Sequence, residues 1–122
     1  MLNRDDLKTA VATVGAADAD VGSAIPQNMR RFIYAIKATN IFNGANLLTI
    51  GKRENGAVGT TIIDYVQAAN LYDTWKDPDE LLEDSAPLYI VEGAGAGGTS
   101  YLRAEAGGAS FYLTIWYIDA PA

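Results

Sequence analysis

Beyond position 30 the chain is divided into short apolar runs, and this division limits its fold more than any other feature of the sequence. The runs are rich in β-branched and aromatic residues, and Gly, Asn or Pro interrupts them every eight to twelve residues. Such spacing is typical of antiparallel sandwiches and barrels. With one or two strands from the N-terminal region, it predicts an all-β fold, an antiparallel β-sandwich or jelly roll of about six to eight strands. The expected strands after position 30 are 32–39, 47–53, 59–66, 86–92, 99–106 and 109–119.

Two Asn-Gly dipeptides, Asn43-Gly44 and Asn55-Gly56, separate the first three of these strands. Asn-Gly is the strongest dipeptide signal for a tight hairpin turn, so we expect these strands to form an antiparallel meander. The even positions of the strand 32–39 are all apolar. This pattern predicts that the even face of that strand is buried.

The first 30 residues differ from the rest. They are rich in Ala, Asp and Gly, and they have no sustained apolar period beyond Leu7, Val11 and Val14. Few of them can offset the entropy of ordering, so we expect a short helix or strand followed by an extended arm that orders on a partner. The expected organisation is therefore an N-terminal arm over 1–30 and a β-sandwich domain over 31–122.

Composition excludes several classes of function. The 122 residues, 13.0 kDa, contain no His and no Cys, so Ser-His-Asp and Cys-His nucleophiles, thiolate or imidazole metal sites and disulfides are absent. Nine basic and fifteen acidic side chains give a net charge of −6, which argues against nucleic acid as a partner. The sequence lacks the pattern of a signal peptide and has no apolar run of the roughly 20 residues that a membrane helix needs, so no membrane partner is expected. We expect no enzyme and no cofactor.

A Gly-rich segment, Gly93–Gly98, formally satisfies the dinucleotide fingerprint G-x-G-x-x-G, and Asp119 lies about twenty residues further on. A dinucleotide turn must open a helix, and the residues that follow, including Tyr101 and Leu102, do not favour one. We interpret the segment as the loop of a hairpin.

An acidic segment in the middle of the chain has two interpretations. Asp77-Pro78-Asp79-Glu80 combines an N-cap, a Pro at the first helical position and a Glu three residues after the cap, which predicts a short helical turn near 78–84. The acidic side chains could also offer oxygen ligands to Ca²⁺, but the spaced loop that would support a calcium site is missing. The more economical interpretation is a solvated loop without metal. The acidic residues are Asp73, Asp77, Asp79, Glu80, Glu83 and Asp84.

The last expected strand is apolar on both faces. Its odd positions from 111 to 117 are Phe, Leu, Ile and Tyr, and its outward candidates are Tyr112, Thr114, Trp116 and Ile118. A strand with one solvated face should alternate apolar and polar residues. Two explanations are open: the second face binds another subunit, or a loop or the N-terminal arm covers it. The first explanation makes these four residues an oligomer interface, because Tyr and Trp combine apolar area with a hydrogen-bonding tip.

The order of these strands and turns resembles small jelly-roll β-sandwich proteins of tailed viruses, namely capsid decoration (cement) proteins and related tail or fibre modules. The resemblance spans about residues 31–119 and depends on strand order and turn placement. It rests on the segments Arg31–Asn40, Leu47–Gly51, Leu88–Gly93, Ser100–Ala104 and Phe111–Ile118.

This resemblance implies a non-enzymatic structural protein of the virion, made in the host cytoplasm. Such a protein forms a homo-oligomer, with a trimer favoured, on a capsid or another large protein assembly, and its N-terminal arm grips neighbouring subunits. Here the partner-binding arm would include Ile25, Pro26, Arg30 and Arg31. The acidic loop 73–84 would face solvent.

A rival function from another class is a carbohydrate- or receptor-binding module, which is also commonly a jelly roll. Its site would place the aromatic residues Tyr72 and Trp75 beside the acidic loop, with calcium as an aid. An enzyme that uses Asp64 or Glu80 is a third alternative. Fold alone does not decide among these functions.

Overall fold

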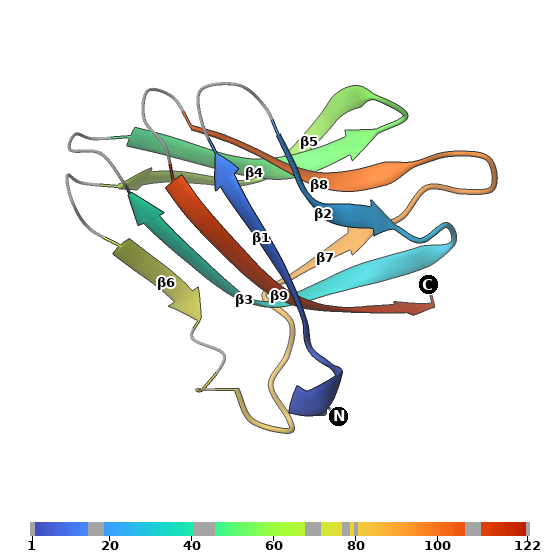
Figure 1. The fold of residues 1–122 in the computed structure, drawn as a ribbon. Helices are drawn as coiled ribbons and strands as arrows, with labels where there is room; N and C mark the ends of the chain where they lie inside the picture. Colours follow the sequence, from blue (N-terminus) through green and yellow to red (C-terminus); the bar gives the residue numbers. More distant parts are fainter. Residues whose placement is uncertain are drawn as a thin grey trace.

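The protein is an all-β sandwich (Figure 1). The computed structural model describes residues 2–14, 19–40, 46–67, 72–76, 79, 81–106 and 111–121. These contain one short 3-10 turn, η1 (Arg4–Asp6), and nine strands. No helix among the described residues has the length and apolar character that a membrane span requires. The strands are β1 (Lys8–Val14), β2 (Ala19–Ile25), β3 (Met29–Asn40), β4 (Asn46–Glu54), β5 (Ala57–Gln67), β6 (Tyr72–Lys76), β7 (Tyr89–Glu92), β8 (Ser100–Ala106) and β9 (Phe111–Pro121).

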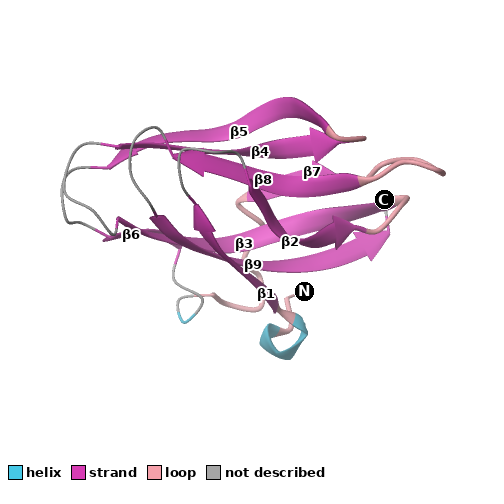
Figure 2. Ribbon diagram, turned by 45° about the horizontal axis from the view of Figure 1, so that its top comes forward, coloured by secondary structure: helices cyan, strands magenta, loops and turns pink. Residues whose placement is uncertain are grey.

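The strands form two antiparallel sheets that face each other (Figure 2). Sheet A has the order β1-β9-β3-β6, and β7 also pairs with β3. Sheet B has the order β2-β8-β4-β5. Strands β6 and β7 share one side of β3, because β7 pairs with Arg30–Ile33 and β6 with Ile36–Thr39.

The strand pairs are nested in the sequence, so that each outer pair encloses the inner ones. The innermost pair is β4 with β5, followed outward by β3 with β6, β2 with β8 and β1 with β9. Successive pairs alternate between sheet B and sheet A. This alternation is the arrangement of a jelly roll. The predicted all-β jelly roll is therefore confirmed, with nine described strands where about six to eight were expected.

The turn at Asn55-Gly56 is confirmed. It joins β4 and β5 as a two-residue loop between the paired residues Glu54 and Ala57. Both loop residues have positive φ, 52° for Asn55 and 82° for Gly56. A loop of this kind has the twist that antiparallel strands need, and Asn and Gly tolerate positive φ better than other residues.

The predicted meander of three strands is wrong. Strands β3 and β4 lie in different sheets, so the chain crosses the sandwich between them; the dipeptide Asn43-Gly44 lies outside the described residues. The loop Gly93–Gly98 is not a hairpin loop either, because it leads from β7 in sheet A to β8 in sheet B. Strand β8 follows this loop, which agrees with our rejection of a dinucleotide-binding turn, since such a turn would open a helix. Turn residues show where the chain reverses direction. Which strands pair depends on how the whole chain is distributed between the two sheets.

The N-terminal region, expected as a short helix or strand followed by an extended arm, supplies one strand to each sheet. Alternate residues of β1, Ala10, Ala12 and Val14, pack into the core, so β1 has the period of a half-buried strand. β1 and β2 come close at a corner of the sandwich: a Cβ added at Gly22, where φ is +77°, would lie 2.8 Å from the Cβ of Ala10. In the described part of the first 30 residues, the segment before Lys8 and the turn at 26–28 lie outside the strands.

A bulge in β3 changes which of its residues face the core. The register with β9 shifts between Ile33 and Ala35. Ile33 therefore packs in the core, and so do Ile36 and Ala38, whereas Ala35 belongs to a cluster on the outer face of sheet A. The prediction of a buried even face holds for the second half of the strand only.

The helical turn expected near 78–84 lies partly outside the described residues. The described part includes a turn in which the backbone N–H of Ser85 donates to the carbonyl of Leu82 at 3.0 Å. The Ser85 hydroxyl accepts from the N–H of Leu82 at 2.9 Å and closes the turn from the other side. This turn places Leu81 against sheet A.

Candidate functional site

The candidate site is the outer face of β9, the strand that lies between β1 and β3 in sheet A. Its inward side chains, Leu113, Ile115 and Tyr117, are buried in the core between the sheets. Its outward side chains differ in exposure. Tyr112 is 55% exposed, whereas Thr114, Trp116 and Ile118 are half-buried. The outer face therefore has two halves with different surroundings.

The covered half contains Trp116 and Ile118. Both pack against a second cluster of buried residues, Leu2, Ala35 and Leu81, to which the partly buried Leu7 and Tyr34 also belong. The N-terminal residues and the 81–85 turn thus cover this half from outside. For Trp116 and Ile118 the structure favours the explanation in which the chain seals its own sheet.

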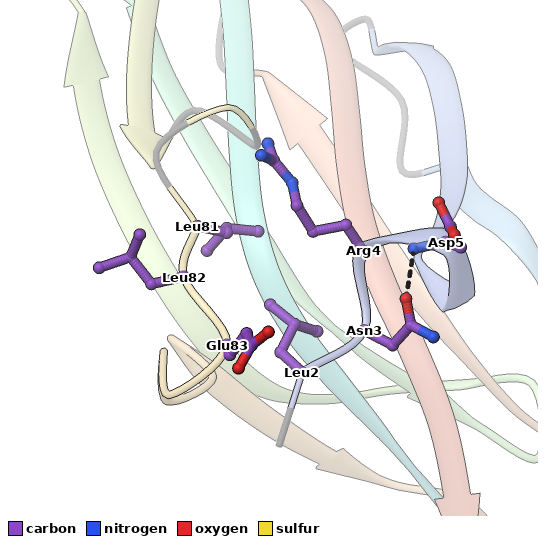
Figure 3. A pocket seen from close by; sticks show the side chains of 7 residues that line it. All are labelled: Leu2, Asn3, Arg4, Asp5, Leu81, Leu82 and Glu83. Atoms are coloured by element: carbon purple, nitrogen blue, oxygen red, sulfur yellow. Dashed lines mark hydrogen bonds between the residues drawn. The ribbon is translucent and has the colours of Figure 1, made fainter.

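We call residues Leu2–Leu7 the strap. Its anchor is Leu2, which is 5% exposed and whose backbone N–H donates to the carbonyl of Glu83 at 2.7 Å. Figure 3 shows the side chains of Leu2 and Leu81 pointing toward each other, while Leu82 points away. Burial of one leucine contributes about 1.5–3 kcal/mol.

The strap also forms an exposed ion pair with the segment that follows β6. Arg4 and Asp79 form an ion pair at 3.5 Å, but their side chains are 48% and 95% exposed, and such pairs contribute at most about 1 kcal/mol. No residue of η1 is buried. A surface hollow of about 620 Å³ lies between the strap and residues 81–83 (Figure 3). Within the strap, Leu2 is the buried side chain, and the partly buried Leu7 packs against the same cluster.

The open half lies at the other end of β9 and extends onto the edge strand β1. Val11 pairs with Thr114 and Thr13 pairs with Tyr112, so these side chains share one face. Val11 is 60% exposed, which is high for an aliphatic residue in a strand. Sequence reasoning missed Val11. The available signal was its position between Ala10 and Ala12, because a strand that buries these two alanines must turn Val11 outward.

Arg31, expected in a partner-binding arm, lies inside the sandwich instead. Its side chain is 1% exposed, and its Nε and Nη2 donate to the two carboxylate oxygens of Asp119 at 2.8 and 3.0 Å. The same guanidinium donates to the carbonyl of Ser23 at 3.0 Å and lies 4.0 Å from the ring centre of Tyr117. Arg31 therefore joins sheet A to β2 of sheet B and is not accessible to a partner.

The other expected arm residues are also part of the fold. Ile25 is buried in the core, and Pro26 is exposed in the turn that follows β2. Arg30 is half-buried, and its Nη2 lies 3.0 Å from a carboxylate oxygen of Glu92. The structure thus brings neither Ile25 nor Arg31 to the surface, and the four residues do not form an arm.

Other candidate chemistry receives no support from the described residues. Within them, no three carboxylates come together to hold a metal ion. Glu83 and Asp84 are exposed on the turn beside the strap. The side chains of Asp64, Tyr72, Asp73, Trp75, Asp77 and Glu80 lie outside the description.

Comparison with known protein families, with curated proteins and with solved structures finds no match to this chain.

Proposed function

We propose that this is a non-enzymatic structural protein that self-associates and binds a larger assembly, as a capsid decoration protein of a tailed virus does. The observation that carries the proposal is the open half of the β9 face, where Val11 and Tyr112 are 60% and 55% exposed side by side with threonines. Exposed apolar side chains grouped on one face are typical of interaction sites. Tyr suits such a site because its ring is apolar and its hydroxyl can bond to a partner.

The fold supports a role in assembly through its geometry. The open half begins at β1, an edge of sheet A, so a neighbouring copy can approach it without moving either sheet. A capsid presents many equivalent positions, and subunits linked as an oligomer, with a trimer favoured, gain affinity from binding several of them at once. Weak contacts by single subunits are then sufficient. We propose the virion as the place where the protein acts, because a capsid supplies such repeated positions.

Self-association is tested by the solution mass of the purified protein, measured by light scattering over a range of concentrations. We expect an oligomer whose association constant falls about tenfold with Val11→Ser and more with Tyr112→Ser, because a buried side chain of this size contributes about 1.5–3 kcal/mol. Ile90→Ser is the matched control, since Ile90 is 52% exposed on β7, at the edge of sheet A opposite β1. A strict monomer, or an equal effect of the control, would contradict the proposal.

Binding to a larger assembly is tested with capsids of a tailed virus that lack their decoration protein. We expect saturable binding that sediments with the particles and that Tyr112→Ser weakens. Binding that rises linearly with concentration, without saturation, would remove the capsid role and leave self-association as a separate question.

A further inference from the structure

We propose that the strap regulates the interface: closed, it covers Trp116 and Ile118, and its release adds this covered half to the open half around Val11 and Tyr112. This inference rests on the proposed function, because it assigns the released surface to a second copy of the chain. It explains why one strand carries an outward apolar face of which only one half is accessible.

The two halves form one surface. Tyr112, Thr114, Trp116 and Ile118 alternate along the same face of β9. Across β9, Thr9 pairs with Trp116 and Val11 pairs with Thr114, so the neighbouring strand β1 runs beside both halves without a break. A second copy that binds the open half therefore lies next to the strap and gains contacts if the strap leaves.

The strap is built to move as a unit. Three of its backbone N–H groups bond within the strap: the N–H of Asp5 donates to Oδ1 of Asn3 at 3.1 Å (Figure 3), and the N–H groups of Asp6 and Leu7 donate to the carbonyls of Asn3 and Arg4. These bonds persist when the segment swings away. Toward the rest of the described protein, the N–H of Leu2 donates to the carbonyl of Glu83, and the exposed Arg4 side chain contacts Asp79.

The pivot lies where the strap meets β1. Lys8 pairs with Tyr117 of β9, so the chain is fixed in sheet A from that residue onward. Leu7 is extended, with φ −64° and ψ 126°, and only partly buried. Release therefore requires withdrawal of Leu2 and Leu7 from the cluster around Leu81 and separation of Arg4 from Asp79, and it leaves the described strand pairs intact. Segments with so few buried contacts open at low free energy.

The experiment compares Leu2→Ser with the control Asp5→Asn in a Trp75→Phe background, in which Trp116 is the only tryptophan, since the chain has two. Acrylamide quenching of Trp116 reports release of the strap, and sedimentation velocity reports self-association. We expect Leu2→Ser to raise the quenching constant about twofold and the association constant about tenfold, the change that one additional buried side chain produces. Asp5→Asn should change neither, because the Asp5 side chain is exposed.

The outcomes separate this inference from the proposed function. If Leu2→Ser raises quenching but self-association stays at the wild-type level, the strap is only a structural cover and the inference is overturned. Unchanged quenching overturns it as well. If neither wild type nor variant associates, the proposed function fails, and the regulatory role fails with it. Should Leu2→Ser not fold, as judged by circular dichroism, Leu81→Ala weakens the same contact from the opposite side and takes its place.

Discussion

Arg31 shows how one charged residue can hold two sheets together. It follows Arg30 directly in the sequence, yet Arg30 forms an exposed ion pair while Arg31 is buried with Asp119, two carbonyl groups and the ring of Tyr117. The sequence contains no sign of this difference, because a basic doublet has the same composition in either setting. The alternation of faces along β3 causes it: adjacent residues of a strand point to opposite sides.

We expect Arg31→Lys to lower the free energy of unfolding by about 2–4 kcal/mol, because an ammonium group cannot bond to both carboxylate oxygens and the carbonyls at once. Arg30→Lys, the adjacent control, should change it by less than about 0.5 kcal/mol. Urea denaturation measures both. If the two variants were equally stable, the buried ion pair would not be contributing.

A second residue-scale prediction concerns Ser100, which is fully buried and whose hydroxyl has no hydrogen-bond partner among the described residues. A buried polar group without a partner costs free energy, so Ser100→Ala should leave stability unchanged or raise it by about 1 kcal/mol. Thermal unfolding measures the effect, with the exposed Ser23→Ala as control. A clear loss of stability in Ser100→Ala would reveal a bond to bound water.

At the scale of elements, strand positions were easier to predict than strand partners. The runs near β4, β5, β7, β8 and β9 were located because β-branched and aromatic residues mark them. Before residue 30 the sequence predicted one or two strands without locating them, because the inward residues of β1 include the small Ala10 and Ala12, which carry little apolar signal. The pairing partners were missed because they depend on how the whole chain is distributed between the two sheets, and no local pattern encodes that arrangement.

The segment after β7 packs closely against the turn between β2 and β3, and this contact gives a prediction at the scale of elements. A Cβ at Gly93, just after β7, would lie 2.5 Å from the carbonyl oxygen of Pro26 and 2.8 Å from that of Met29. Backbone atoms cannot yield easily, so Gly93→Ala should destabilise the protein by about 1–3 kcal/mol. Gly95→Ala, in the same loop, should stay within about 0.5 kcal/mol, because nothing lies within 4 Å of its Cβ. Equal melting temperatures of the two variants would contradict the close approach of these loops.

At the scale of the whole molecule, the candidate site was predicted in part. The sequence indicated that β9 has two apolar faces, and it left open whether another subunit or the chain itself covers the outer one. In the structure its own chain covers Trp116 and Ile118 and leaves Tyr112 exposed. The cover comes from Leu2 and Leu81, which are far apart in the sequence. A single strand pattern cannot reveal a contact of that kind.

The net charge leads to a prediction for the whole molecule. Each copy carries −6, so copies repel one another while the Val11 and Tyr112 surface attracts them. Raising NaCl from about 20 to about 200 mM shortens the range of the repulsion and should strengthen self-association. Sedimentation velocity at the two salt concentrations measures the change. Weaker association at high salt would mean that ion pairs, and not apolar contacts, hold the interface together.

The position of β9 has a consequence for synthesis on the ribosome. β9 comes last among the described strands, yet it lies in the middle of sheet A between β1 and β3. Both neighbours emerge from the ribosome long before the strand that joins them is translated, and their unpaired edges are open to wrong partners during that time. A nascent chain that stalls before Phe111 therefore lacks the centre of one sheet and is the species most exposed to aggregation.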